Sequence, residues 1–179
     1  MKYIGILLAV LMLVGCQTNK VVVEKEIGLL DTVKERGYLV CGVNAGLPGF
    51  ASEDEEGNWS GLDVDFCRAV SAAVFGDADK VEYLGLNSAQ RFPTLASGSI
   101  DILSRNTTWT ISRDVNLMFE FAGVSYYDGQ GFLVPAALGI TSARGLDGAF
   151  VCIASETTSE LNLNDYFAEN NMAYKPIYV

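Results

Sequence analysis

Short apolar segments that alternate with helical ones constrain the fold of this chain more than any other feature. Residues 38–43, 81–84 and 99–103 have the composition of buried strands, and residues 62–75 and 88–96 form helical patterns between them. Strands separated by helices pair in parallel, because each crossover returns the chain to the same end of the sheet. The pattern therefore predicts an α/β fold. It also predicts that functional side chains gather at the carboxyl ends of the strands.

The alternation starts again in the second half of the chain. Residues 149–153 form a strand pattern, Thr157 to Glu160 matches a capping box that opens a helix, and residues 174–179 are strand-like. Between the two halves, residues 110–116 predict a short helix and residues 119–122 predict a strand. We therefore expect a second α/β unit after the first.

The amino-acid composition excludes several kinds of site. The 179 residues include no histidine, which excludes Ser-His-Asp and Cys-His catalysis, HExxH zinc sites and histidine-ligated haem. A formal net charge of −10 argues against a nucleic-acid partner, because phosphate recognition needs clustered Lys and Arg. The four cysteines form no CxxC pair, so the sequence predicts neither a metal site nor a cofactor.

The N-terminus has the pattern of an export signal. Lys2 precedes a dozen mostly apolar residues, a stretch too short for a membrane-spanning helix, which needs about 20. Residues 13–16 resemble the lipobox of bacterial lipoproteins. This implies a signal peptide over residues 1–15, acylation of Cys16 and a tether over residues 16–28. We expect an exported protein, anchored by lipid at Cys16 on the periplasmic or cell-surface face of a membrane. A plain secretory signal with a chance cysteine is the alternative.

Three motifs occur in order after this segment: GLDVD at 61–65, SIDILSRNTTWTISR at 99–113 and YDGQG at 127–131. Together they resemble the extracytoplasmic solute-binding proteins that deliver polar amino acids to ABC importers, most of all the general L-amino-acid and glutamate/glutamine/aspartate group. The resemblance covers residues 29–179. It implies a periplasmic-binding-protein-like fold of two α/β lobes that close over the ligand by a hinge motion.

The resemblance also implies how the lobes divide the chain. Lobe 1 is expected at residues 29–123, nearly complete, and the hinge with the first part of lobe 2 at residues 124–179. Because the family continues beyond this point, we interpret the chain as C-terminally truncated. A pared-down natural domain is the alternative.

The family's carboxylate clamp falls on Arg113. A guanidinium gives bidentate hydrogen bonds to a carboxylate, and the start of the following helix adds partial positive charge. Thr108, Asn106 and Thr107 are expected to contact the ligand beside it. An Arg near a helix start is otherwise a surface residue, which is the alternative.

Further contacts follow from the resemblance. Ser88 and Arg91 lie in the segment that reaches the substrate side chain in acidic-amino-acid binders, although Arg91 could instead be an exposed helix residue. Asn44 follows the first strand at the mouth of the site, and Thr158 begins the lobe 2 helix that closes over the carboxylate. Glu156 departs from the small residue, usually glycine, that the family has there.

Two of the cysteines are candidates for a disulfide. Cys41 lies on the first predicted strand and Cys67 on the helix expected to cover it, so a bridge is geometrically reasonable. Two reduced, buried thiols are the alternative. Cys152 has no evident partner.

We expect a binding protein rather than an enzyme. Its ligand is expected to be a free L-amino acid (glutamate, glutamine, aspartate or a broader polar set), and its partners the ABC permease subunits. A same-fold cyclohexadienyl dehydratase is the enzyme alternative, with Asp128 or Glu156 as candidate general acids. A sensor input lobe and a non-binding remnant are the others. The chain as it stands is expected to bind weakly or not at all.

Overall fold

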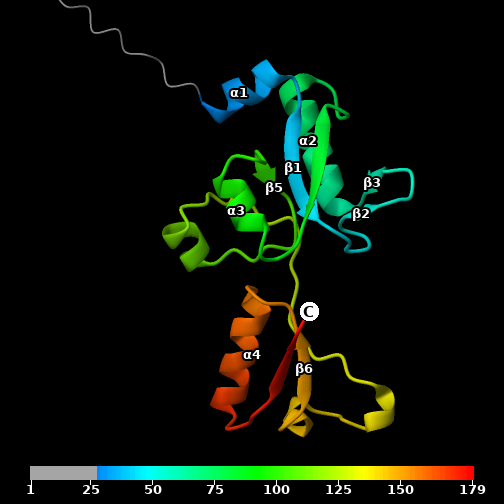
Figure 1. Ribbon diagram of the computed structural model, residues 1–179, viewed down its shortest axis with the longest axis vertical. Coiled ribbons are helices and arrows are strands. Elements are labelled where there is room, and N and C mark those ends of the chain that lie inside the picture. The colour runs from blue at the N-terminus through cyan, green and yellow to red at the C-terminus, as the bar shows by residue number, and fades with distance from the viewer. Residues whose placement is uncertain (1–27) are drawn as a thin grey trace, which may run out of the picture.

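The computed structural model describes residues 28–179, and these form two α/β units in succession (Figure 1). The predicted signal peptide, Cys16 and nearly all of the predicted tether lie outside the described residues. The first unit comprises α1 (Leu29–Arg36), β1 (Leu39–Asn44), β2 (Ser52–Glu53), β3 (Trp59–Ser60), α2 (Leu62–Phe75), β4 (Val81–Leu86), α3 (Arg91–Ala96) and β5 (Ile102–Leu103). The second comprises the 3₁₀ turns η2 (Ala136–Leu138) and η3 (Ala143–Leu146), then β6 (Phe150–Ile153), α4 (Thr158–Glu169) and β7 (Lys175–Tyr178).

The main sheet of the first unit is parallel, in the order β4-β1-β5. The central strand β1 is buried along most of its length, because α2 contacts the sheet and a strand lies on each side. Pairing runs from Leu39 opposite Val81 to Asn44 opposite Leu86. The carboxyl ends of β1, β4 and β5 therefore meet at one edge of the sheet, as the alternation of strands and helices predicted.

The core of the first unit lies between β1 and α2. Cys41, Val43, Val64 and Cys67 are buried there, with Trp59 and Tyr83 packed against them. Cys41 and Cys67 form a disulfide in the structure, which is one of the two states that the sequence left open. The bridge ties the central strand to the helix that covers it.

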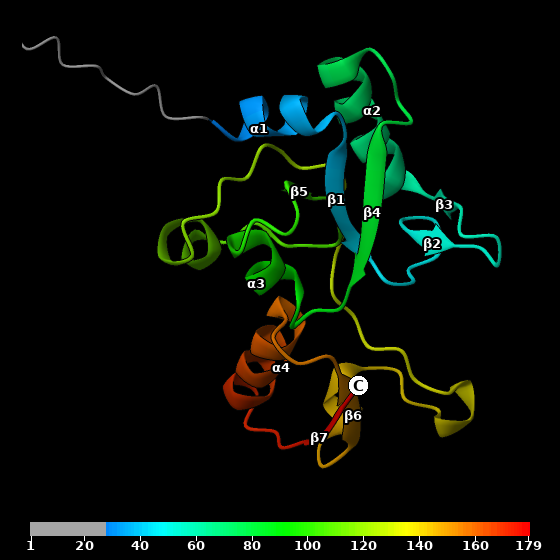
Figure 2. The same cartoon turned by 45° about the horizontal axis from the view of Figure 1, so that its top comes forward.

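The second unit is built on a two-stranded parallel sheet. β6 pairs with β7, and α4 packs its Leu163 and Phe167 against them together with Leu146. Figure 2 shows the start of α4 close to α3 of the first unit. The boundary predicted at residues 123 and 124 falls in the irregular segment between the two units.

One predicted element is wrong. Residues 119–122 form no strand, and β5 is limited to Ile102–Leu103. Phe119 stacks on Phe92 with ring centroids 5.3 Å apart, and Phe121 stacks on Trp109 at the same distance. These aromatic side chains pack on neighbouring rings and not on a paired strand. The apolar pattern at residues 119–122 therefore did not indicate a strand. The short helix predicted at 110–116 is present as the π-helix η1 (Ser112–Asn116).

Candidate functional site between the two units

Polar side chains gather where the strand ends of the first unit face the start of α4. Asn44 ends β1, Asn87 and Ser88 follow β4, and Arg105 and Asn106 follow β5. From the second unit, the loop at residues 154–157 and the first turn of α4 complete the region. Two cavities lie here, of about 240 Å³ and about 510 Å³.

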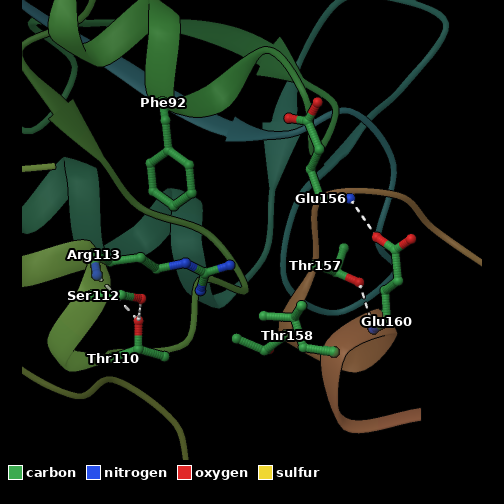
Figure 3. A pocket seen from close by; sticks show the side chains of 9 residues that line it. Phe92, Thr110, Ser112, Arg113, Glu156, Thr157, Thr158 and Glu160 are labelled. Carbon is green, nitrogen blue, oxygen red and sulfur yellow. Dashed lines mark hydrogen bonds between the residues drawn. The ribbon is translucent and has the colours of Figure 1, made fainter. Parts of the chain in front are cut away.

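The smaller cavity brings both units together around Arg113 (Figure 3). Its described lining residues are Thr110, Ser112 and Arg113 at η1, Phe92 of α3, and Glu156, Thr157, Thr158, Glu160 and Leu161 around the start of α4. In Figure 3 the Arg113 side chain extends from η1 in the direction of Thr157 and Thr158. A cation from one unit thus faces a helix N-terminus from the other.

The Arg113 guanidinium is held in place, but only some of its N–H donors form hydrogen bonds. The side chain is 8% exposed, Nη1 donates to the carbonyl of Thr108 over 2.7 Å, and Cζ lies 5.0 Å from the ring centroid of Phe92. Burial lowers the pKa of Arg113. Among the described residues, the ion pairs are Arg36 with Asp101 and Arg68 with Asp79, so Arg113 has no carboxylate partner there. Its remaining N–H donors can serve an anion in the cavity.

Thr108 and Thr158 connect the two units beside this guanidinium. Their hydroxyl oxygens share a hydrogen bond of 2.9 Å. Thr158 is the first residue of α4, and Thr157 is its N-cap, whose Oγ1 accepts from the amide of Glu160 over 3.1 Å. The free amides of the first helical turn add partial positive charge on this side of the cavity.

Arg91 lies deeper than the sequence suggested. It is 2% exposed, and its Nη2 donates to the backbone carbonyl of Glu156 over 2.9 Å, so it joins the two units directly. Its Nε is buried without a partner in the structure. Burial, together with the nearby Arg105 and Arg113, lowers the pKa of Arg91 to about 10, which leaves it cationic at neutral pH. Arg91 is not among the residues that line either cavity.

Asn106 is engaged with its neighbours. Its Oδ1 accepts from Asn44 Nδ2 over 2.9 Å and from two nitrogens of Arg105, Nε at 3.2 Å and Nη2 at 3.0 Å. The hydroxyl of Thr107 is buried with no partner in the structure. Asn44 and Ser88 both line the larger cavity. The structure therefore brings all eight predicted binding residues into one region, although only some of them face a cavity.

Arg105 is one of two residues of this region that the sequence did not predict. It is 8% exposed and lines the larger cavity, and its Nη1 donates to the carbonyl of Asn87 over 2.8 Å. A signal was available, because Arg105 stands two residues after β5, at the strand end where parallel sheets place ligands. Phe92, whose ring lies beside both Arg91 and Arg113, was missed as well.

Metal and membrane features were searched over the same residues. Between residues 28 and 179 there is no cluster of three or more Cys, Asp or Glu side chains able to hold a metal ion. Over that range, none of the helices has both the length and the apolar character needed to cross a bilayer.

Comparison with known proteins identifies the family. Residues 39–174 match the bacterial extracellular solute-binding proteins, family 3. The chain belongs to this family of solute-binding proteins. Its periplasmic-binding-protein-like fold is shared with solved structures, and the family is extracytoplasmic.

Individual members of the family are similar over most of this chain. The general L-amino acid-binding periplasmic protein AapJ of Rhizobium johnstonii is 57% identical over 148 residues, which are 83% of this chain and 43% of that protein. The glutamate/glutamine/aspartate/asparagine-binding protein BztA of Rhodobacter capsulatus is 53% identical over 150 residues, 84% of this chain and 44% of that protein.

A solved structure is similar to the same extent. The ABC transporter periplasmic binding protein from Brucella ovis with glutathione bound superposes with a TM-score of 0.80 at 54% identity, covering 84% of this chain and 47% of that one. This solute-binding protein chain therefore spans somewhat less than half the length of the relatives it matches.

Proposed function

We propose that this chain binds the α-carboxylate of a polar L-amino acid through Arg113, in the cavity between the two units. The observation that carries the proposal is a buried guanidinium with unused donors and no carboxylate partner in the described chain, facing the N-terminus of α4. Leaving such a cation without an anion costs free energy, and a ligand carboxylate supplies the missing partner.

Neighbouring groups complete the carboxylate site. Thr108 and Thr158 place two hydroxyl groups beside Arg113, and the first turn of α4, whose free amides carry partial positive charge, lines the same cavity. Asn106 and Thr107 are proposed as contacts through backbone or side chain, while Asn44, Ser88 and Arg91 are proposed to lie around the ligand side chain. Because Asn106 already accepts hydrogen bonds from Arg105, its side chain also holds that guanidinium in place.

The class of ligand follows from the relatives. Their names describe binding of general L-amino acids and of glutamate, glutamine, aspartate and asparagine, and the similar solved structure holds glutathione. We therefore propose a polar amino acid as the ligand and ABC permease subunits as the partner that receives it. Among the described residues, no nucleophile paired with a base lines the cavities, which favours binding over catalysis. Of the two candidate general acids, Asp128 lies outside both linings, whereas Glu156 lines the smaller cavity with its side chain directed away from Thr157 and Thr158 (Figure 3).

Lipid anchoring at Cys16 is proposed on the lipobox-like sequence alone. Labelling of cells that produce the chain with a radioactive fatty acid tests it. The wild type is expected to incorporate the label, and Cys16→Ser is expected to incorporate none. An unlabelled wild-type chain, or equal labelling of the two, would refute the anchor.

Titration with amino acids tests the carboxylate site. Arg113→Ala is expected to weaken the binding of L-glutamate and L-glutamine by at least about tenfold, because a charge-assisted hydrogen bond is lost for either ligand. Arg68→Ala removes the same charge from the exposed surface of α2 and should leave binding unchanged. Equal affinities for Arg113→Ala and the wild type would disprove the assignment. Turnover of prephenate would instead support the dehydratase alternative.

A further inference from the structure

The sequence contains two Asp-Gly pairs, Asp128-Gly129 and Asp147-Gly148. In such a pair the backbone nitrogen of the glycine can attack the carboxyl carbon of the aspartate side chain and close a succinimide ring. Glycine favours this reaction because it has no side chain beside its nitrogen and few limits on its backbone angles. Ring closure also needs a carboxyl group that lies against the nitrogen. The structure gives the two pairs different surroundings in this respect.

Asp128-Gly129 lies in the segment that joins the two units. Residues 124–133 are exposed and form no helix or strand. Asp128 Oδ1 accepts a hydrogen bond from the Gly129 amide over 2.7 Å, and within residues 28–179 neither group has another hydrogen-bond partner. A Cβ at Gly129 would have no heavy atom within 4 Å, so the pair has space to close the ring. The carboxyl group is therefore already placed against the nitrogen that attacks it.

Asp147-Gly148 is held in a turn by a second segment of the chain. The Gly148 amide donates to the carbonyl of Ala173 over 2.6 Å, and Asp147 Oδ1 accepts from the amide of Ala173 over 2.8 Å. Ring closure by the Gly148 nitrogen would break both hydrogen bonds, which tie the turn before β6 to the turn before β7. The two pairs are thus the same dipeptide, but only the second has its reacting groups bound to another part of the chain.

We propose that Asp128-Gly129 is a site of spontaneous isomerisation to isoaspartate, and that Ala173 protects Asp147-Gly148 from the same reaction. The Gly129 nitrogen loses its proton and bonds to Cγ of the protonated Asp128 carboxyl group, whose hydroxyl group leaves with that proton as water. A second water then adds to one of the two imide carbonyls and breaks its bond to the nitrogen. Opening at Cγ restores aspartate, and opening at the main-chain carbonyl carbon leaves an isoaspartyl linkage.

The isoaspartyl linkage lengthens the main chain between two anchors. Before the pair, the Tyr126 ring packs on Phe50 of the first unit with ring centroids 5.1 Å apart. After it, Gln130 Nε2 donates to the carbonyl of Ser159 in α4 over 2.9 Å. Isomerisation routes the main chain through Cβ and Cγ of Asp128, which adds one carbon atom between these anchors. The connection between the two units therefore changes in length while the composition of the chain stays the same.

Peptide mapping of the aged full chain tests the proposal. One sample is kept folded in mildly acidic buffer made with H₂¹⁸O and another is kept in the same buffer with urea. Electron-transfer fragmentation of the digested peptides distinguishes isoaspartate from aspartate, and ¹⁸O incorporation counts every ring opening. In the folded chain, both signals are expected to accumulate about tenfold faster at position 128 than at position 147, because ring closure at position 147 must first break two hydrogen bonds. In urea the two rates should become similar.

Gly129→Ala is the matched variant. The added methyl group meets no heavy atom of the fold within 4 Å but stands beside the attacking nitrogen. Circular dichroism should therefore show a folded chain, while isoaspartate at position 128 forms about tenfold more slowly. The proposal is wrong if the folded chain isomerises as fast at position 147 as at position 128, or if Gly129→Ala leaves the rate unchanged. Absence of isoaspartate at position 128 in the folded chain would also overturn it.

NMR of the purified isomerised chain tests the effect on the connecting segment. The side-chain amide resonance of Gln130 is expected to shift, because the longer main chain moves this group away from the Ser159 carbonyl. Unchanged resonances of both Gln130 and the Tyr126 ring would show that the added atom leaves the two anchors in place, which would overturn this part of the proposal. The reaction needs no bound ligand, so neither result depends on the proposed function.

Discussion

Glu156 shows how one residue combines backbone strain with the electrostatics of the cleft. Its φ is 59°, a left-handed conformation that costs a side-chain-bearing residue about 1–2 kcal/mol. The family is expected to have a small residue here, and glycine adopts this conformation freely. In Figure 3 the Glu156 side chain is directed away from Thr157 and Thr158, and its charge raises the pKa of Arg91. The carboxylate therefore avoids the anion site and partly balances Arg91.

Replacing Glu156 by glycine is expected to stabilise the chain. Glu156→Gly relieves the left-handed conformation and should raise the free energy of unfolding by about 1 kcal/mol in urea denaturation, after the lost attraction to Arg91 is subtracted. Glu156→Gln removes the charge but keeps the strain, so it should show no such gain. Equal effects of the two substitutions would show that backbone strain is not the cause.

Single residues in the cleft were predictable to different degrees. Arg113 and Thr108 could be placed because a family motif surrounds them, and the structure puts both beside the cavity. Arg105 lies in the same motif but escaped notice, because its role depends on which cavity it faces. The contact between Arg91 and Glu156 joins residues 65 positions apart, so no local pattern contains it.

Among the elements, α4 has the clearest relation between sequence and structure. Thr157 was expected to open a capping box, and its Oγ1 accepts from the Glu160 amide as the N-cap. The Glu160 carboxylate, however, accepts from the amide of Glu156 over 3.0 Å, one residue earlier than the ideal box. The cap thus fixes the loop at residues 156–157 as well as the first turn of the helix.

Loss of this cap should destabilise α4 and loosen the loop that lines the cleft. Thr157→Ala is expected to lower the free energy of unfolding by about 1 kcal/mol, because an N-cap hydrogen bond is lost. Amide hydrogen exchange over residues 158–169 should also become faster in this variant, because α4 opens more often without its cap. Thr157→Ser keeps the hydroxyl and should behave like the wild type. An alanine variant as stable as the serine variant would contradict the role of the cap.

Helix bounds could be predicted more closely than strands. α2 spans residues 62–75 as expected, because Gly76 ends it in the left-handed conformation. Gly61, with φ 127°, precedes it, and a Cβ there would lie 2.3 Å from the carbonyl oxygen of Phe50. The predicted strand at 119–122 failed because a strand needs a partner, and the apolar residues there pack on other aromatic rings. Pairing is a tertiary property that a short apolar pattern does not specify.

At the scale of the whole molecule, the chain is acidic but contains a local cluster of buried positive charges. The chain has a formal net charge of −10, yet Arg91, Arg105 and Arg113 are buried together between the two units. Each has its pKa lowered by burial, and none has a carboxylate partner within ion-pair distance among residues 28–179. Such a concentration of cations, which nearby carboxylates balance only in part, attracts an anion to this region despite the acidic composition of the chain. The fold class was predictable from strand–helix alternation, whereas this charge cluster required the fold to bring α3, the end of β5 and η1 together.

A crystal structure of the chain grown with L-glutamate at saturating concentration tests the central claim most directly. The account predicts that both oxygens of the α-carboxylate lie about 3 Å from the Arg113 guanidinium, between η1 and the first turn of α4. Glutamate bound elsewhere, with Arg113 still bonded only to the Thr108 carbonyl, would contradict it.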